Sequence, residues 1–289
     1  MNSETTKKNI GVIGNGFVGS ALAAGFALDT NVYVYDVDRK KRVHPIGELA
    51  RQSDFIFVCV PTPMKLETGE IDLSIIRSVF ANLKKVEKKK DQIIIIKSTV
   101  TPNSLSRIIE ENSELRIVFS PEFLTERSAR LDFINSSRII LGGMPTDLDK
   151  VEEMFRVRFP YTRIIKTDIA TAQFIKYMAN CFFATKVSFM NEMFQAASVL
   201  KVDWDQTMEG LLSDGRIGNS HVDVPGHDGY LGFGGKCFPK DLNAFIKLFE
   251  DIGVEPTIMK AVWEKNIEVR ECRDWLEIKG ATSNNKENS

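Results

Sequence analysis

The 289-residue sequence lacks several features that mark whole classes of protein. Its formal net charge of −1 gives no electrostatic reason to expect binding to nucleic acid or to an acidic membrane. The first residues, MNSETTKKN, contain no apolar segment of a secretory signal, and no uncharged run is long enough to span a bilayer. We therefore expect a cytoplasmic protein with neither a nucleic-acid partner nor a membrane partner.

Cysteine and histidine are also scarce. The four cysteines show no C-x-x-C spacing, so reduced thiols are expected at Cys59, Cys181, Cys237 and Cys272. The segment 221–229, HVDVPGHDG, contains two of the three histidines and two aspartates. Because it also contains Pro and Gly and has no helical H-x-x-x-H frame, we interpret it as a polar loop and expect no metal site.

What the sequence does contain is a dinucleotide-binding pattern near its start. Residues 9–28 combine an apolar strand, a glycine turn and an alanine-rich helix, with Gly14, Gly16 and Gly19 in G-x-G-x-x-G spacing. The first glycine permits the turn, the second lets the backbone approach a pyrophosphate, and the third lets helix and strand pack closely. The context makes this pattern more specific than the spacing alone.

A second strand, 31–38, follows this helix and contains Asp36 near its end. A carboxylate at this place accepts hydrogen bonds from the ribose of NAD and repels the additional phosphate of NADP. The sequence therefore favours NAD, although Arg39, Lys40 and Arg42 leave NADP open.

Apolar strands and helices alternate through the first half of the chain. The largely apolar strands expected within 54–63, 93–102 and 115–123 predict a parallel sheet with helices on both faces. Ligands of such sheets bind at the carboxyl ends of the strands. Besides the glycine turn and Asp36, these ends carry Thr62, Thr99 and Glu122.

The pattern changes at residue 168. Residues 168–200 contain neither Gly nor Pro and predict one long, broadly apolar helix, typical of burial between domains or subunits. Lys176 and Asn180 are four residues apart on one face of it. They either face a site or, in the case of Lys176, extend to solvent, because burying them without partners is costly.

These patterns predict an α/β protein with a Rossmann-like, mostly parallel sheet followed by an all-helical central domain. We expect the NAD-binding domain at residues 1–167 and the helical domain at 168–272. Residues 273–289 end in small polar side chains and are expected to be a disordered tail.

The segment 232–242, GFGGKCFPKDL, contains the cysteine with the most distinctive surroundings. If a helix starts near Pro239, Cys237 and Asp241 lie one turn apart, and the neighbouring lysines favour a thiolate. The glycines would let a substrate approach the backbone. A buried structural cysteine is the general alternative, but a nucleophile beside an NAD site indicates oxidation through a covalent thio-adduct.

Seven segments together resemble the UDP-glucose/GDP-mannose dehydrogenase family, in the order in which the family has them. They are 14-GNGFVG-19, 58-VCVPTP-63 with 69-GEIDLS-74, 97-KSTV-100, 121-PEFLTERSARLDFINSSRIILGG-143, 173-QFIKYMANCFFATKVSFMNE-192, 215-GRIGNS-220 and 232-GFGGKCFPKDL-242. The resemblance extends from the glycine turn to about residue 270. It implies a four-electron oxidation of a nucleotide-sugar C6 alcohol by two NAD in succession, with UDP-glucose to UDP-glucuronate as the expected case.

The resemblance also implies roles for individual residues. Cys237 would hold the aldehyde as a thiohemiacetal and then as a thioester, and Lys176 and Asn180 would stabilise the developing oxyanion. Asp241 would position water, Glu122 would act as acid and base in the hydrolysis, and Thr99 would order that water. The cofactor residues implied are Gly14, Gly16, Phe17, Val18, Gly19, Asp36, Pro61, Thr62, Thr99 and Glu126. The substrate residues implied are Glu122, Phe123, Leu124, Lys176, Asn180, Arg216, His221, Phe233 and Gly234.

In the family, the arginine that matches Arg216 acts on the neighbouring subunit, so we expect a homodimer built on the long helix. Family members normally continue into a second Rossmann-like domain that covers the nucleotide. We therefore expect a separate chain to supply that half, or the 216–235 loop to hold most of the substrate. The alternative is a silent or weakly active NAD-binding dimeric subunit.

Overall fold

The computed structural model describes residues 7–283, which fall into two compact units. Unit 1 comprises the described residues up to Thr62 together with Leu73–Lys176. Unit 2 comprises Pro63–Asp72 and the described residues from Tyr177 onward. Each unit is described by itself below.

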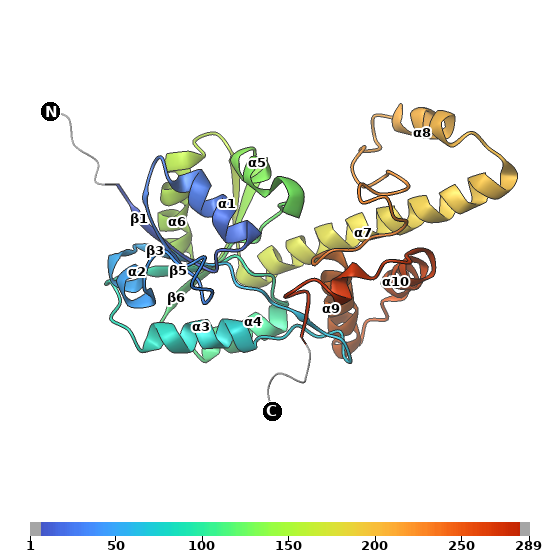
Figure 1. Ribbon diagram of the computed structural model, residues 1–289. Helices are drawn as coiled ribbons and strands as arrows, with labels where there is room; N and C mark the ends of the chain where they lie inside the picture. Colours follow the sequence, from blue (N-terminus) through green and yellow to red (C-terminus); the bar gives the residue numbers. More distant parts are fainter. Residues whose placement is uncertain (1–6, 284–289) are drawn as a thin grey trace. The chain divides into compact units, whose positions relative to one another are not determined.

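Unit 1 is built on a seven-stranded sheet with the order β2-β1-β3-β5-β6-β7-β8 (Figure 1). Its strands are β1 (Asn9–Ile13), β2 (Asn31–Tyr35), β3 (Phe55–Val58), β5 (Ile93–Ile96), β6 (Arg116–Phe119), β7 (Arg138–Gly142) and β8 (Arg163–Thr167). Neighbouring strands run parallel, except that β6 and β7 meet antiparallel at Phe119 and Gly142. The mostly parallel sheet confirms the predicted fold class of this part of the chain.

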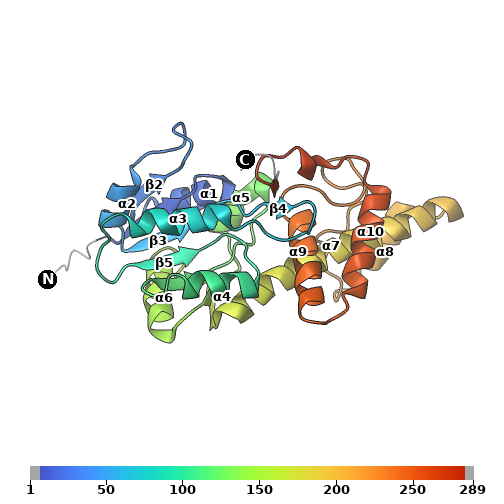
Figure 2. The same ribbon diagram turned by 90° about the horizontal axis from the view of Figure 1, so that it is seen from below.

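Alternate residues of each strand enter two separate apolar cores, one on each face of the sheet. In β5, for example, Ile93 and Ile95 belong to one core and Ile94 and Ile96 to the other. The first core lies under α1 (Phe17–Phe26), α5 (Ala129–Ile134) and α6 (Pro145–Arg158). The second lies under α2 (Ile46–Gln52), α3 (Ser74–Lys84) and α4 (Pro102–Glu110) (Figure 2). Burial on both faces explains why β3 and β5 are apolar at every position.

Unit 2 is helical. A single helix, α7 (Ile169–Leu200), contributes its start as far as Lys176 to unit 1 and the rest to unit 2. It is followed by α8 (Trp204–Leu212), α9 (Phe238–Asp251) and α10 (Thr257–Val269). The division between the two compact units therefore lies within α7, nine residues beyond the predicted boundary at 167/168, because the start of α7 packs on the sheet. No helix in residues 7–283 combines the length and apolar character needed to cross a membrane.

Residues 273–283 differ from the disordered tail expected from residue 273 onward. They form η2 (Asp274–Leu276) and β9 (Thr282–Ser283), which pairs with β4 (Met64–Lys65). Trp275 is buried in a small core with Met64 and Ala281. The apolar area of the tryptophan outweighs the polar composition around it. The remainder of the expected tail, 284–289, lies outside the described residues.

Candidate active site

The glycine turn between β1 and α1 has the geometry that dinucleotide binding requires. Gly14 has φ = +95°, and a Cβ there would lie 2.7 Å from the carbonyl oxygen of Cys59. A Cβ at Gly19 would overlap the carbonyl oxygen of Gly14. By contrast, a Cβ at Gly16, directly before α1, would have no neighbouring atom within 4 Å. Gly14 and Gly19 therefore shape the turn, and Gly16 leaves the N-terminus of α1 open to a pyrophosphate.

Asp36 is held beside this turn by the backbone. Its carboxylate accepts hydrogen bonds from the N–H groups of Asn15 (2.6 Å) and Asp38 (2.8 Å). The guanidinium of Arg42 donates instead to the carbonyl oxygens of Asp36 (2.8 Å) and Val37 (3.2 Å). The carboxylate is thus oriented at the end of β2, the position expected for a ribose acceptor.

The loops after β3 and β5 are joined to each other. Thr62 Oγ1 donates to the carbonyl oxygen of Thr99 (2.8 Å), and Ser98 Oγ donates to that of Val60 (2.7 Å). Thr62 and Thr99 therefore lie side by side at the carboxyl edge of the sheet, as expected from the strand order. The other expected cofactor residues are Phe17 and Val18 in the first turn of α1, exposed Pro61, and Glu126 at the start of η1 (Glu126–Ser128).

Glu122 and Lys176 form a buried ion pair in unit 1. Lys176 Nζ lies 3.0 Å from Glu122 Oε1, and the side chains are only 3% and 6% exposed, respectively. The backbone N–H of Leu124 donates to the second carboxylate oxygen at 2.7 Å, and Lys176 Nζ lies 5.4 Å from the centre of the Phe123 ring. Lys176 therefore does not extend to solvent. The pair places an acid and a base in direct contact, where each charge depends on the other.

A second buried polar group lies in unit 2. Asn180 Nδ2 donates to Asp241 Oδ2 at 2.6 Å, and Lys240 pairs with the other carboxylate oxygen. Asp241 is 1% exposed. Its backbone N–H donates to the carbonyl oxygen of Cys237 at 2.8 Å, which closes the first turn of α9. The structure thus confirms that Cys237 and Asp241 are one helical turn apart.

The remaining expected substrate residues also lie in unit 2, in different surroundings. Arg216 is 89% exposed at its side chain and pairs with Asp214 at 2.5 Å. His221 stacks on Phe183, with ring centres 4.3 Å apart. Phe233 is buried. No group of three His, Cys, Asp or Glu side chains in the described part of the chain is arranged to hold a metal ion.

The structure gives the glycines before Cys237 a role that differs from the one first expected. A Cβ at Gly232 would overlap Asn266 Oδ1, and a Cβ at Gly234 would overlap the side chains of Asp274 and Arg270. These two glycines are therefore required by the packing of the protein itself. Gly235, with φ = +75° and no atom within 4 Å of a Cβ, is the one that faces open space.

Both units match models of one protein family. Residues 44–158 match the NAD binding domain, and residues 170–268 the central domain, of the UDP-glucose/GDP-mannose dehydrogenase family. The UDP-glucose 6-dehydrogenase of Rickettsia bellii is 30% identical over 299 residues, which cover 90% of this chain and 67% of that relative. The chain belongs to the UDP-glucose/GDP-mannose dehydrogenase family.

Other members support the same assignment. The UDP-glucose 6-dehydrogenase of Haloferax volcanii is 31% identical, with coverage of 89% of this chain and 69% of the relative. A solved UDP-glucose dehydrogenase from Pyrobaculum islandicum superposes with a TM-score of 0.78 at 26% identity, covering 93% of this chain and 70% of that one. The chain spans between 52% and 69% of the length of such curated members.

Lys97 is a buried residue of this family member that sequence reasoning did not assign to the site. It follows β5, and its Nζ donates to the carbonyl oxygen of Pro121 (3.0 Å) and to Ser120 Oγ (3.3 Å). Burial lowers the pKa of Lys97 to about 8, against the opposing effects of Cys59 and Glu122. A lysine directly after four isoleucines, at the carboxyl end of a strand, was the signal available in the sequence.

Lys97 and Glu122 also line a cavity in unit 1. The cavity has a volume of about 270 Å³, and Phe123 and Arg138 form part of its wall. The guanidinium of Arg138 lies 4.3 Å from the centre of the Phe123 ring. The ammonium group of Lys176 also lies near this ring. Burial raises the pKa of the neighbouring Cys59 thiol to about 12, which disfavours a thiolate there.

Proposed function

We propose that this chain catalyses the NAD-dependent oxidation of a nucleotide-sugar C6 alcohol to the uronic acid, with UDP-glucose to UDP-glucuronate as the expected case. The observation that carries the proposal is the first turn of α9, where Cys237 is followed one turn later by a buried carboxylate held by Asn180. Family membership supplies the substrate class. A thiol in this setting has a use in oxidising an aldehyde to an acid, and none in a single-step alcohol oxidation.

The glycine turn fits the cofactor. Gly16 and the N-terminus of α1 would hold the pyrophosphate, and Asp36 would accept the ribose hydroxyls. NAD bound there supplies the hydride acceptor for both oxidations, one molecule for each. Thr62 and Thr99, at the same edge of the sheet, would complete the cofactor site.

The first oxidation also requires that a proton leave the sugar hydroxyl. Lys176 and Glu122 are in direct contact, so a proton accepted by one can be shared with the other. An amide carries two N–H donors, so Asn180 can hold Asp241 with one and the substrate oxygen with the other. We assign Lys176 and Asn180 to stabilisation of negative charge on that oxygen.

Cys237 retains the aldehyde between the two oxidations. Its thiolate forms an S–C bond to the aldehyde carbon while the carbonyl electron pair moves to the oxygen, which takes a proton. Loss of a hydride and a proton then gives a thioester, and water attacks its carbon, breaks the C–S bond and returns the thiol. The N-terminus of α9 stabilises the thiolate. We assign Asp241, Glu122 and Thr99 to the activation and positioning of that water.

We also propose a cytoplasmic homodimer formed through α7. Four large apolar side chains lie four, seven and four residues apart on this helix and are exposed: Met178, Phe182, Phe189 and Met193. This spacing places them on one face, and such an exposed apolar face marks an interaction site. The exposed Arg216 is available to act on a partner subunit, as the family resemblance implies.

The test is NADH formation by the purified chain with UDP-glucose, GDP-mannose and UDP-N-acetylhexosamines. We expect about two NADH per UDP-glucose. A second arm adds the C-terminal part of the Rickettsia bellii relative as a separate polypeptide, since this chain spans 67% of that protein. NAD binding without NADH formation in either arm would refute the enzyme and favour the alternative, a silent NAD-binding dimeric subunit.

Cys237→Ser separates the two halves of the proposed reaction. Without the thiol no thioester forms, so we expect no release of uronic acid while NAD binding is retained. The matched control is Cys272→Ser, because it is the carbonyl rather than the thiol of Cys272 that accepts a hydrogen bond from Arg270. Uronic acid formation at the unmodified rate by Cys237→Ser would contradict the covalent route.

A further inference from the structure

The loop that leads into Cys237 has an ordered path without regular secondary structure. We call residues 226–236 the glycine loop; it contains five glycines and ends directly before the cysteine. Glycine has the largest conformational freedom to lose on folding. A nucleophile at the end of such a segment is positioned only if other side chains hold the loop, and α7 and α10 provide them.

Asn266 of α10 holds the middle of the glycine loop. Its Oδ1 accepts from the backbone N–H of Phe233 at 2.7 Å, and its Nδ2 donates to the carbonyl oxygen of the same residue at 3.0 Å. Asn266 is fully buried. The backbone N–H of Gly232 donates to Asn191 of α7 at 3.1 Å. One amide thus satisfies both polar groups of a buried loop residue, as a neighbouring strand would do.

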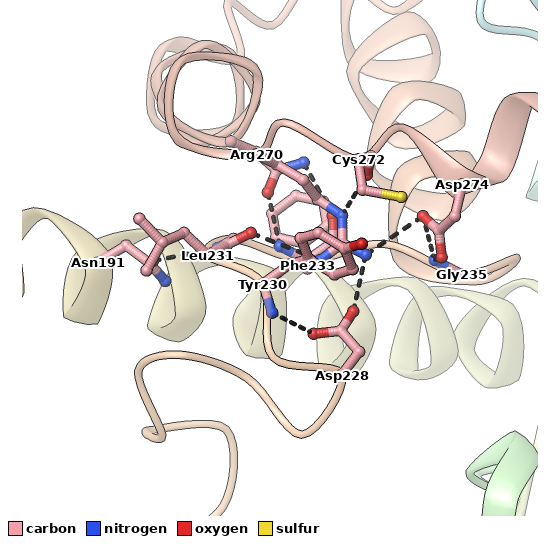
Figure 3. A network of polar contacts seen from close by, with 11 residues as sticks. Asn191, Asp228, Tyr230, Leu231, Phe233, Gly235, Arg270, Cys272 and Asp274 are labelled. Atoms are coloured by element: carbon pink, nitrogen blue, oxygen red, sulfur yellow. Dashed lines mark hydrogen bonds and ion pairs between the residues drawn. The ribbon is translucent and has the colours of Figure 1, made fainter.

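Arg270, the residue directly after α10, holds both ends of the loop (Figure 3). Its guanidinium, 1% exposed, donates to Asp228 at 2.7 Å and lies 3.4 Å from a carboxylate oxygen of Asp274. Asp274 in turn accepts the backbone N–H of Gly235 at 3.0 Å. Burial acts to raise the pKa of Asp228, but the hydrogen bonds from Arg270 and from the backbone of Tyr230, together with the charges of Arg270 and His227, outweigh it and leave that pKa below its usual value.

Asn266, Arg270 and Asp274, which we call the anchors, come very close to the backbone of the glycine loop. Gly232 and Gly234 have no room for a Cβ, because Asn266 stands against the first and Arg270 and Asp274 against the second. Arg270 Nε also donates to the carbonyl oxygen of Cys272 at 2.8 Å, which fixes the segment that carries Asp274. The guanidinium is therefore satisfied on three sides, and a buried charge of this kind tolerates little displacement.

We propose that Arg270, together with Asn266 and Asp274, is a positioning residue that holds the glycine loop so that Cys237 Sγ is placed for addition to the aldehyde. This inference rests on the proposed function for the reaction itself. Asp274 acts on the backbone N–H of Gly235, two residues before the nucleophile, and none of the three residues is assigned a contact with a reacting atom. A displacement of about 1 Å at the sulfur is enough to cost roughly 100-fold in rate.

Three variants test the proposal: Arg270→Lys, Asp274→Asn and Gly234→Ala. The lysine keeps the charge but cannot make the forked contacts, the asparagine removes the charge that orders Gly235, and the alanine inserts a methyl group between loop and anchors. The control is Gly210→Ala, because a Cβ at Gly210 in α8 meets no atom within 4 Å. We expect kcat to fall by up to about 100-fold in the three variants, with KM for NAD unchanged and Gly210→Ala like the unmodified protein.

Two measurements on the same proteins do not need turnover. The rate at which iodoacetamide alkylates Cys237, followed by peptide mass spectrometry, measures the reactivity and accessibility of its sulfur. The rate of backbone hydrogen exchange in residues 228–236 measures how tightly the glycine loop is held. We expect the alkylation rate of Cys237 to change and exchange to accelerate there, but not in unit 1. These two measurements test the positioning role even if the protein oxidises no nucleotide-sugar. A failure to oxidise any nucleotide-sugar would count against the proposed function, but not against the positioning role.

Arg270→Lys carries the risk of misfolding, so the milder Asp274→Asn and Gly234→Ala decide between the outcomes. If both proteins show the unmodified alkylation rate at Cys237 and unmodified exchange in the glycine loop, the positioning role is wrong. It is equally wrong if loop exchange accelerates while alkylation and kcat stay unchanged, because the anchors would then serve stability only.

Discussion

Asn180 Nδ2 and Asp241 Oδ2 lie 2.6 Å apart, a hydrogen bond that joins α7 to α9 between residues separated by 61 positions. Lys240 holds the other oxygen of the same carboxylate. Asp241 is therefore oriented one turn after Cys237, in surroundings almost closed to solvent. In unit 1 a second carboxylate, Glu122, is paired with Lys176 in the same manner. We propose that the two pairs supply the proton chemistry of the reaction.

Removing the amide should cost both stability and activity. We expect Asn180→Ala to lower the free energy of unfolding by about 2 kcal/mol, as for loss of a hydrogen bond to a charged group. Asp241→Asn should cost more, about 3–5 kcal/mol, since it leaves the Lys240 charge buried without its partner. Urea unfolding of both variants and of the double variant gives the coupling energy. Additive effects would show that the hydrogen bond contributes nothing.

The glycine turn allows binding to be separated from folding. Gly16→Ala places a methyl group where no protein atom lies within 4 Å, so stability should change by less than about 0.5 kcal/mol. The same methyl group stands in the way of a pyrophosphate, and we expect NAD affinity to fall at least about tenfold, or roughly 1.4 kcal/mol. Calorimetric titration with NAD measures this.

Gly19→Ala is the matched comparison within the same turn. Here the added Cβ overlaps the carbonyl oxygen of Gly14, so the fold itself should be destabilised. Thermal unfolding should therefore distinguish Gly19→Ala from Gly16→Ala. NAD binding by Gly16→Ala with unmodified affinity would contradict the assignment of the cofactor to this turn.

Lys97 should make stability depend on pH in a defined window. Its pKa in the folded protein is about 8, below the ordinary value of 10.5, so between these values the unfolded chain binds a proton that the folded one does not. Stability from this group is therefore lowest below about pH 8 and rises as the pH increases. Below about pH 8, Lys97→Met should be more stable than the unmodified protein, because it lacks the buried charge. This difference in the free energy of unfolding should shrink by about 2 kcal/mol between about pH 8 and pH 9.5.

The comparison between the two proteins is needed because Cys59 acts in the opposite direction. Its raised pKa, about 12, makes the folded protein lose stability as the pH rises above the ordinary value of 9.0. This contribution begins only above about pH 9, so the change in stability between pH 8 and pH 9 reports mainly Lys97. If the difference in the free energy of unfolding between the two proteins stays constant from pH 7 to pH 9.5, burial does not lower the pKa of Lys97.

The apolar face of α7 should control the oligomeric state. Phe182→Glu places a charge among the four exposed apolar side chains, and we expect it to shift a dimer toward monomers in analytical ultracentrifugation. The fold should persist, since Phe182 is 61% exposed in the chain by itself. Glu209→Lys on α8, a charge change away from this face, is the control. A monomeric unmodified protein would refute the proposed dimer.

Short-range patterns predicted much of this fold. Four consecutive isoleucines at 93–96 indicated a strand buried on both faces, and the structure places alternate residues in the two cores. The spacing of Gly14, Gly16 and Gly19 predicted the turn, and the absence of Gly and Pro predicted α7. Each of these signals lies within one element, where backbone geometry and periodicity act locally.

Trp275 shows where such signals end. The polar residues around it indicated a tail, but the side chain is buried against Met64, a residue from the other end of the sequence of unit 2. The same holds for Gly234, which the sequence pattern assigned to substrate approach and whose lack of a side chain the structure explains by the contacts of Arg270 and Asp274.

The sequence by itself determined most strands and helices and the glycine turn, and it singled out Cys237 as the proposed nucleophile, because each of these signals depends on residues adjacent in the chain. Only the tertiary structure decided which charges are paired: Lys97 with the carbonyl group of Pro121, Lys176 with Glu122, and Arg270 with Asp228. Their partners are 24, 54 and 42 positions away. The physical reason is that a buried charge needs a partner in space, and packing alone determines which distant residue that is.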